Sequence, residues 1–264
     1  MKSTRDGLTL TAWSTHFLGT RNKGQQLLDL VSSIDSGRWR PDKWGHFEPI
    51  RIPFDAAHYP QMLSAWTEER PPGSGRVSNS LGFTKSKPKT LIWASASRLT
   101  VPLLNYIWFD LDSRPFASSD GVERLIDVML AAVKWTDGTY ASMAHWKQAH
   151  RRIVQMTPLE RLERLDWLTF FGAPYIEMFG RSRVLATPCH EVREVEGGIL
   201  LVAAPRPDGP EMTDSDELLL TLEEYLGPDA FAGRGYPQTP CRVPRFDLSE
   251  LTVPSATVGN LRPH

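Results

Sequence analysis

Cysteine is scarce in this chain, and long hydrophobic runs are missing. The two cysteines, Cys189 and Cys241, belong to no Cys-x-x-Cys pair, so a zinc site would need single ligands from elsewhere. Two unpaired thiols fit a reducing compartment better than a disulfide framework. No run of 18 apolar residues occurs, and the first residues lack the apolar segment of a signal peptide. We therefore expect a soluble, cytoplasmic protein with no membrane partner.

The chain also lacks an excess of charge of one sign. Lys and Arg number 30 and Asp and Glu 31, which gives a net charge of -1. No overall basic field is present to attract nucleic acid, so we expect no nucleic-acid partner. The nine tryptophans are the unusual feature of the composition. Such large amphipathic rings are enriched at protein interfaces, although cores hold them more often.

Catalytic motifs are missing as well. No serine stands in a Gly-x-Ser-x-Gly motif, and no glycine-rich phosphate loop joins a strand to a helix. His145 and His150 lack the glutamate and the spacing of a His-Glu-x-x-His motif. Cys189 and His190 are neighbours that would point to opposite faces of a strand. We therefore expect no enzymatic activity, no catalytic residues, no metal site and no cofactor.

Hydrophobic periodicity predicts alternating elements in the first part of the chain. The expected elements are a strand over residues 8–13, helices over 21–35 and 56–66, three strands between 76 and 112, a helix from 120 and a strand over 139–146. Residues 38–54 are expected to form a proline-containing loop. The short connections between the three strands indicate an antiparallel meander.

In the second part, Thr157 and Pro158 are expected to start a helix that Gly172 ends. A further helical turn, a hairpin and a leucine-rich helix over 215–226 should follow. The stretch 167–202 is dense in aromatic residues, and we interpret it as core. Together the elements predict an α+β fold, a mostly antiparallel sheet with helices packed on one face. Residues 1–232 should form a single domain, with a subdivision near residue 155 left open, and 233–264 an extended proline-rich C-terminal tail.

One predicted strand could carry function. In NYIWFDLD, alternation places Tyr106, Trp108, Asp110 and Asp112 on one face. Two carboxylates at this spacing could hold Mg²⁺ or Mn²⁺, but such a site needs a further acid and a Lys or His, and none is close in sequence. The alternative is a half-exposed strand whose polar face contacts a partner.

A second candidate is an acidic segment near the C-terminus. Eight acids and no Lys or Arg occur between 208 and 229; they are Asp208, Glu211, Asp214, Asp216, Glu217, Glu223, Glu224 and Asp229. Acids at the start of a helix have a structural reason, because the helix dipole favours them. A local negative field would also attract basic protein surfaces and speed association with them.

The chain resembles the immunity protein 52 family, which belongs to bacterial polymorphic-toxin and type VI secretion systems. Three stretches carry this resemblance: the opening strand that ends in Trp13, the WFDLD strand with Phe109 and Asp110, and the segment FFGAPYIEMFGRSRVLATPCHEVREVEGGILLVAAP. The resemblance implies a non-enzymatic α+β inhibitor that is made beside a toxin, typically a nuclease of the restriction-endonuclease class, and binds it tightly. The tail over 233–264 departs from the family pattern.

These observations predict an immunity protein that neutralises a cognate type VI secretion toxin by direct binding, the toxin being a nuclease with a basic surface. The expected partner-binding residues are Trp108, Asp110, Asp112, Asp214, Asp216, Glu217, Glu223 and Glu224. Two alternatives stay open. One is a metal-dependent enzyme that uses Asp110 and Asp112, and the other is an adaptor subunit that loads a secreted effector.

Overall fold

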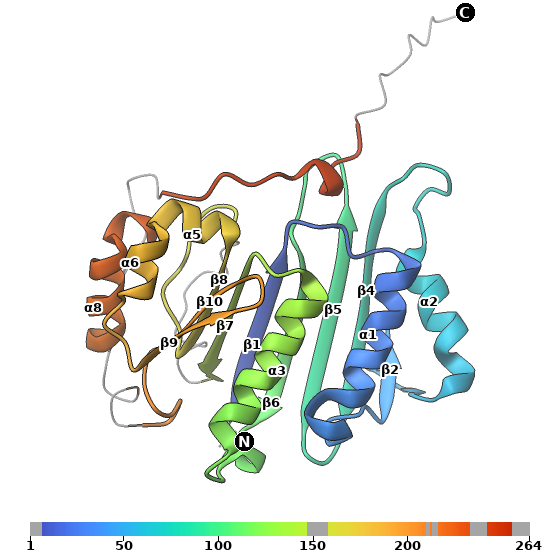
Figure 1. Ribbon diagram of the computed structural model, residues 1–264. Helices are drawn as coiled ribbons and strands as arrows, with labels where there is room; N and C mark the ends of the chain where they lie inside the picture. The colour runs from blue at the N-terminus through green and yellow to red at the C-terminus, as the bar shows by residue number, and fades with distance from the viewer. Residues whose placement is uncertain (1–6, 147–157, 210–211, 213–215, 233–241, 255–264) are drawn as a thin grey trace, which may run out of the picture.

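A ten-stranded antiparallel sheet forms the centre of the molecule (Figure 1). The computed structural model describes residues 7–146, 158–209, 212, 216–232 and 242–254. The strands are β1 (Gly7–Ser14), β2 (Lys43–Gly45), β3 (Ile52–Pro53), β4 (Val77–Lys85), β5 (Thr90–Arg98), β6 (Asn105–Asp112), β7 (Tyr140–His145), β8 (Leu168–Gly172), β9 (Glu191–Val195) and β10 (Gly198–Val202). Their order in the sheet is β3-β2-β4-β5-β6-β1-β7-β8-β10-β9. The predicted α+β class and the antiparallel meander of β4, β5 and β6 are confirmed.

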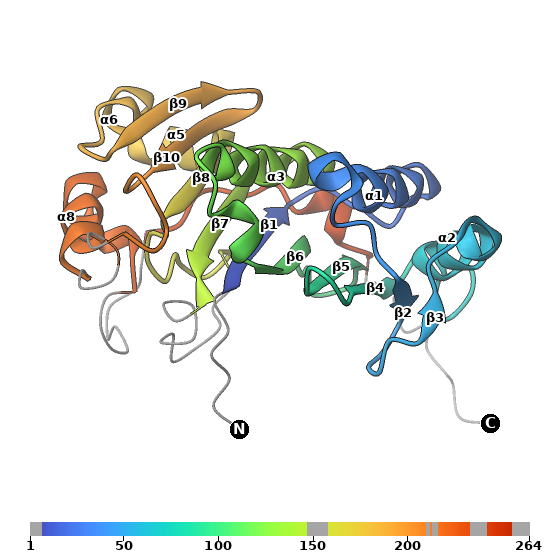
Figure 2. The same cartoon turned by 90° about the horizontal axis from the view of Figure 1, so that it is seen from below.

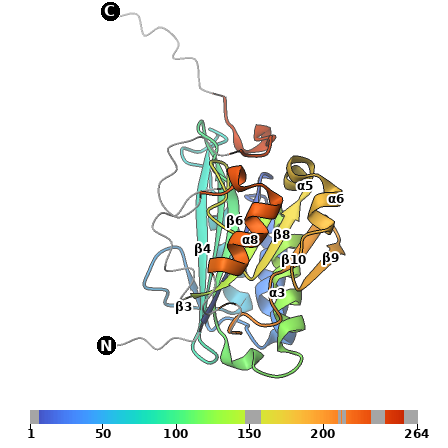
Figure 3. The same cartoon turned by 90° about the vertical axis from the view of Figure 1, so that its left-hand side faces the viewer.

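The helices are α1 (Arg21–Ser33), α2 (Tyr59–Thr67), α3 (Gly121–Thr136), α5 (Ala173–Phe179), α6 (Arg181–Leu185) and α8 (Asp216–Leu226). Figure 2 shows α1 and α3 on one side of the strands β1, β4, β5 and β6, and Figure 3 shows α3 on that side of β4 and β6. On β1 the side chains of Leu8, Leu10 and Ala12 are fully buried toward these helices. None of the described helices combines the length and the apolar composition needed to cross a bilayer.

Tryptophan side chains and one ion pair fix the helices to each other. The indole of Trp66 on α2 is fully buried and donates to the carbonyl of Leu18 at 2.8 Å. Asp35, just after α1, accepts bonds from Trp39 Nε1 at 2.8 Å and from Arg124 Nε on α3 at 2.9 Å. Burial alone would raise the pKa of Asp35, but the bonds from Arg124 and Trp39 outweigh it and lower that pKa below its usual value.

The expected helix from Thr157 to Gly172 is wrong throughout its described part: residues 158–167 contain no helix, and residues Leu168–Gly172 form the strand β8. Thr157 itself lies outside the described residues. This strand lies inside the sheet between β7 and β10, and each of its five residues is buried. A strand buried on both faces shows a continuous apolar run, which periodicity cannot separate from a helix. Two short strands, β2 and β3, also lie within the expected loop over 38–54.

Residues 242–254 form a strap along one edge of the molecule, the red segment across the top of Figure 1. Arg242 pairs with Asp229 at one end, at 2.9 Å. At the other end Leu251 is fully buried, and its carbonyl accepts a bond from Leu99 N next to β5 at 3.0 Å. Within the expected extended tail, the described part is therefore packed on the body, with one short 3-10 turn at Ser249–Leu251.

Candidate partner-binding surface

The face of β4, β5, β6 and β1 that lies opposite α1 and α3 is covered by no described helix (Figure 2). We call it the open face. Strand register places seven large or charged residues on it: Trp13, Leu91, Trp93, Tyr106, Trp108, Asp110 and Asp112. All seven are half-buried, whereas their strand neighbours on the helix side are buried. The alternation predicted for NYIWFDLD is therefore confirmed.

Cross-strand neighbours hold the open-face aromatic rings in place. Trp13 on β1 pairs with Tyr106 on β6, and their ring centroids are 5.0 Å apart. Trp93 leans over the neighbouring strand β4, where a Cβ atom added to Gly82 would lie 2.2 Å from its ring. Glycine is thus required at position 82 for this ring to lie flat on the sheet.

Asp110 and Asp112 differ in their surroundings. The Asp112 carboxylate accepts bonds from the Arg114 side chain, at 2.8 Å from Nε, and from the Arg114 backbone N–H. These bonds hold the pKa of Asp112 below its usual value. Asp110 has no ion pair within the described part of the chain. It lines a cavity of about 610 Å³ whose apolar wall includes Pro49, Ile50 and Leu91.

A metal site at these two acids gains no support from their surroundings. Within the described residues, no group of three His, Cys, Asp or Glu side chains has the arrangement of a metal site. Asp112 is already neutralised by Arg114. The third acid that the metal hypothesis requires is therefore not brought to the pair by the described part of the fold.

The acidic segment is less uniformly charged than the sequence suggests. Arg206 and Arg242, which flank the segment, pair with Asp208 and Asp229. Glu217 and Glu224 are exposed on α8, and Asp216 is the first residue of that helix. Glu211 and Asp214 lie outside the described residues. The negative field of the described part thus comes mainly from α8.

Glu223 does not belong to the exposed set. Its side chain is buried, with 4% of its surface exposed, and it accepts a bond from the Leu165 backbone N–H at 2.8 Å. A buried amide needs such an acceptor, so Glu223 fixes α8 to the segment before β8. The expectation that Glu223 contacts a partner is therefore corrected.

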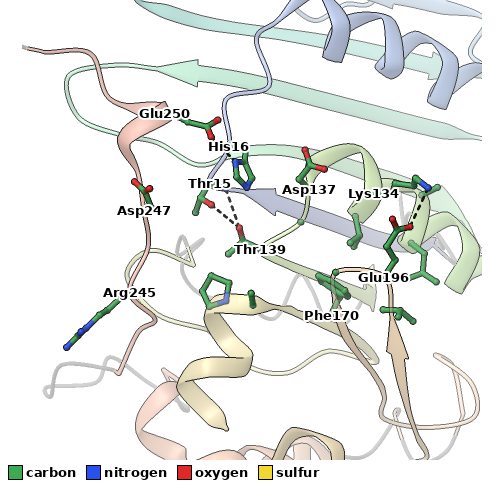
Figure 4. A pocket seen from close by; sticks show the side chains of 18 of the residues that line it. Thr15, His16, Lys134, Asp137, Thr139, Phe170, Glu196, Arg245, Asp247 and Glu250 are labelled. Atoms are coloured by element: carbon green, nitrogen blue, oxygen red, sulfur yellow. Dashed lines mark hydrogen bonds and ion pairs between the residues drawn. The ribbon is translucent and has the colours of Figure 1, made fainter. Parts of the chain in front are cut away.

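A second cavity, of about 790 Å³, opens between the C-terminal end of α3, the β9–β10 turn and the strap (Figure 4). Its floor is apolar and includes Leu130, Phe170 and Pro174. On its rim the His16 imidazole contacts the Glu250 carboxylate at 3.0 Å. Figure 4 shows these two side chains facing each other, close to Asp137.

Polar groups of this cavity hold the strap in place. Glu250 accepts a bond from the Phe17 backbone N–H at 3.0 Å, which, together with His16, lowers the pKa of its carboxyl group. The hydroxyl groups of Thr15 and Thr139 contact each other at 3.3 Å.

Comparisons with known proteins identify the fold. No protein-family model matches the chain, and no curated protein matches it. Among solved structures, it is similar to the Pseudomonas aeruginosa T6SS protein PA0821. The TM-score is 0.57 at 12% sequence identity, over 84% of this chain and 76% of that chain. The fold is that of a protein from a type VI secretion system, and identity this low shows the fold alone.

Four open-face residues, Trp13, Leu91, Trp93 and Tyr106, were not among the expected partner-binding residues. The sequence did indicate their position, since all four stand in predicted strands and alternate with buried residues. What the sequence lacked was the pairing of β1 with β6, which brings Trp13 beside Tyr106.

Proposed function

We propose that this protein is an immunity protein that binds a cognate type VI secretion toxin and neutralises it. The open face carries this proposal. Tryptophan and tyrosine are enriched at the energetic centres of protein interfaces, because they bury a large area at small entropic cost. Here they lie on a sheet face that no described helix covers. The fold shared with a T6SS protein supports the same context.

The proposed toxin is a nuclease with a basic surface, as the resemblance to the immunity protein 52 family implies. The exposed acids of α8, Glu217 and Glu224, would steer it toward this protein over a distance. Steering changes the association rate more than the final affinity. The open face would supply the affinity and α8 the rate.

Co-expression with the adjacent reading frame tests the proposal. That frame should encode a toxin that stops growth when expressed alone, and this protein should restore growth. A pull-down with the catalytically inactive toxin should recover a stable complex. Growth arrest despite co-expression, with no complex formed, would refute the proposal. A complex without protection would favour the adaptor subunit instead.

The steering role of α8 is tested separately. Neutralising Asp214, Asp216, Glu217 and Glu224 together should slow association at low salt and leave dissociation nearly unchanged. Glu223 is left intact in this variant, because it is buried and its loss would disturb the fold. An unchanged association rate would show that the acids of α8 do not steer the toxin.

A further inference from the structure

On the open face, Trp108 and Asp110 are neighbours along β6, and both are half-buried. The two residues are two positions apart on one strand, which separates them by about 7 Å along the sheet. Among the described residues, no ring or cation stacks on Trp108, and no ion pair holds Asp110. The other aromatic residue and the other acid of this strand face do have such partners, since Tyr106 packs on Trp13 and Asp112 pairs with Arg114.

We infer that Trp108 and Asp110 together hold an arginine side chain of the protein partner. The inference rests on the proposed function and specifies the chemistry by which the toxin is recognised. A guanidinium group is planar and can stack on an indole while it donates two bonds to a carboxylate. Trp108 would provide the stacking surface, and Asp110 the charge.

The cavity beside Asp110 has room for the aliphatic stem of such a side chain. Pro49, Ile50 and Leu91 provide its apolar wall. The exposed side chain of Phe47, with 77% of its surface accessible, lies in the same loop. A long side chain can bury its apolar stem in this cavity while its charged head pairs with Asp110.

The charges around this cavity favour a cation. Lys85 is paired with Asp42 at 3.9 Å and Arg114 with Asp112, so each of these positive charges has an acid beside it. Two acids and one base are left at the rim without an ion pair among the described residues: Glu48, Asp110 and Lys89. The balance is negative, which suits an arginine and disfavours an acidic group.

The chain already uses this chemistry in its own packing. Arg98 lies over the Phe17 ring at 4.4 Å, Arg124 over Phe116 at 5.0 Å and Arg242 over Phe179 at 5.6 Å. Two of these arginines are also paired with an aspartate, Arg124 with Asp35 and Arg242 with Asp229. An arginine between Trp108 and Asp110 would repeat across the interface an arrangement found within the fold.

Binding of the inactive toxin from the adjacent reading frame, measured by calorimetry, tests the inference. Asp110→Asn and Trp108→Ala should each weaken binding at least about tenfold, because each removes one side of the arginine site. Asp29→Asn is the matched control, an exposed acid on α1 on the opposite side of the sheet, and it should change affinity by less than about threefold. Circular dichroism confirms that each variant is folded, and Trp108→Phe replaces Trp108→Ala if the latter unfolds.

An alanine scan of the toxin's arginines completes the test. One arginine should lose about as much affinity as Asp110→Asn does, and combining the two changes should cost little more than either alone. If the wild-type protein binds but Asp110→Asn and the tryptophan variant bind as tightly, the arginine site is refuted and the proposed function stands. Equal losses at Asp110 and Asp29 would also refute it, since they would indicate that only the overall negative charge matters. No binding by the wild-type protein would overturn both.

Discussion

At the scale of single residues, the structure separates acids that serve the fold from acids that face solvent. Glu223 and Glu224 are neighbours on α8, yet one is buried and bonded to Leu165 while the other is exposed. Asp110 and Asp112 also differ, because only Asp112 is paired with Arg114. In each pair, we therefore expect partner binding at the acid without an internal bond among the described residues, which is Glu224 on α8 and Asp110 on β6.

Replacing Glu223 should destabilise the protein, whereas replacing Glu224 should not. Glu223→Ala leaves the Leu165 N–H buried without an acceptor, which costs about 1–3 kcal/mol. Glu224→Ala, on the exposed side of the same helix, should change the free energy of unfolding by less than about 0.5 kcal/mol. Urea denaturation measures both. Equal effects would mean that the bond to Leu165 contributes nothing.

At the scale of elements, the Asp35–Arg124 pair connects the end of α1 with α3. Asp35, Ser36 and Gly37 all have positive φ angles, of 49°, 56° and 80°. This conformation is unfavourable for residues other than glycine, so surrounding contacts must maintain it. The Asp35 carboxylate, with 8% of its surface exposed, receives those contacts from Arg124 and Trp39.

Asp35→Asn should lower stability at neutral pH by about 2 kcal/mol, because Arg124 loses its charged partner. The folded state lowers the pKa of Asp35, so its stabilising effect is complete above the unfolded pKa near 3.9 and is lost as the pH falls through the lower folded value. The variant should therefore lose less stability than the wild type between about pH 5 and 3. Asp29→Asn, an exposed change on α1, is the control. Parallel pH profiles for Asp35→Asn and wild type would contradict this account.

How much was predictable from sequence also depends on the element. β6 and α3 were predicted well because each has one buried face, and the residues on that face recur at the period of their own element. β8 was missed because its residues are buried on both faces. The candidate surface was only partly predictable, since its composition depends on the long-range pairing of β1 with β6.

At the scale of the whole molecule, the strap joins distant parts of the chain. Glu250 contacts His16 and Phe17 just after β1, while Arg242 binds the carbonyl of Met178 near α5. The strap thus fastens the half with β8 and α5 to the half with β1 and β5.

Loosening the strap should open it locally without unfolding the sheet. Leu251→Ala removes a fully buried side chain and should weaken strap docking by about 2–4 kcal/mol. The amides of Leu99 and Val253, which bond across the strap, should then exchange with solvent much faster, while amides of α3 keep their protection. Val243→Ala, an exposed change in the same strap, is the control. Equally accelerated exchange in α3 would show that the strap is part of the global core.

The central position of β1 sets a time for folding during synthesis. Its neighbours in the sheet are β6 and β7, so Leu8 finds its partners only when the ribosome has released residues 111 and 145. Pairings this distant along the chain form slowly, because a long loop must close first. The open face, which needs Trp13 from β1 beside Tyr106 from β6, cannot form before β6 is released. If this face protects the cell from a toxin, protection begins only after β6 has been translated and paired with β1.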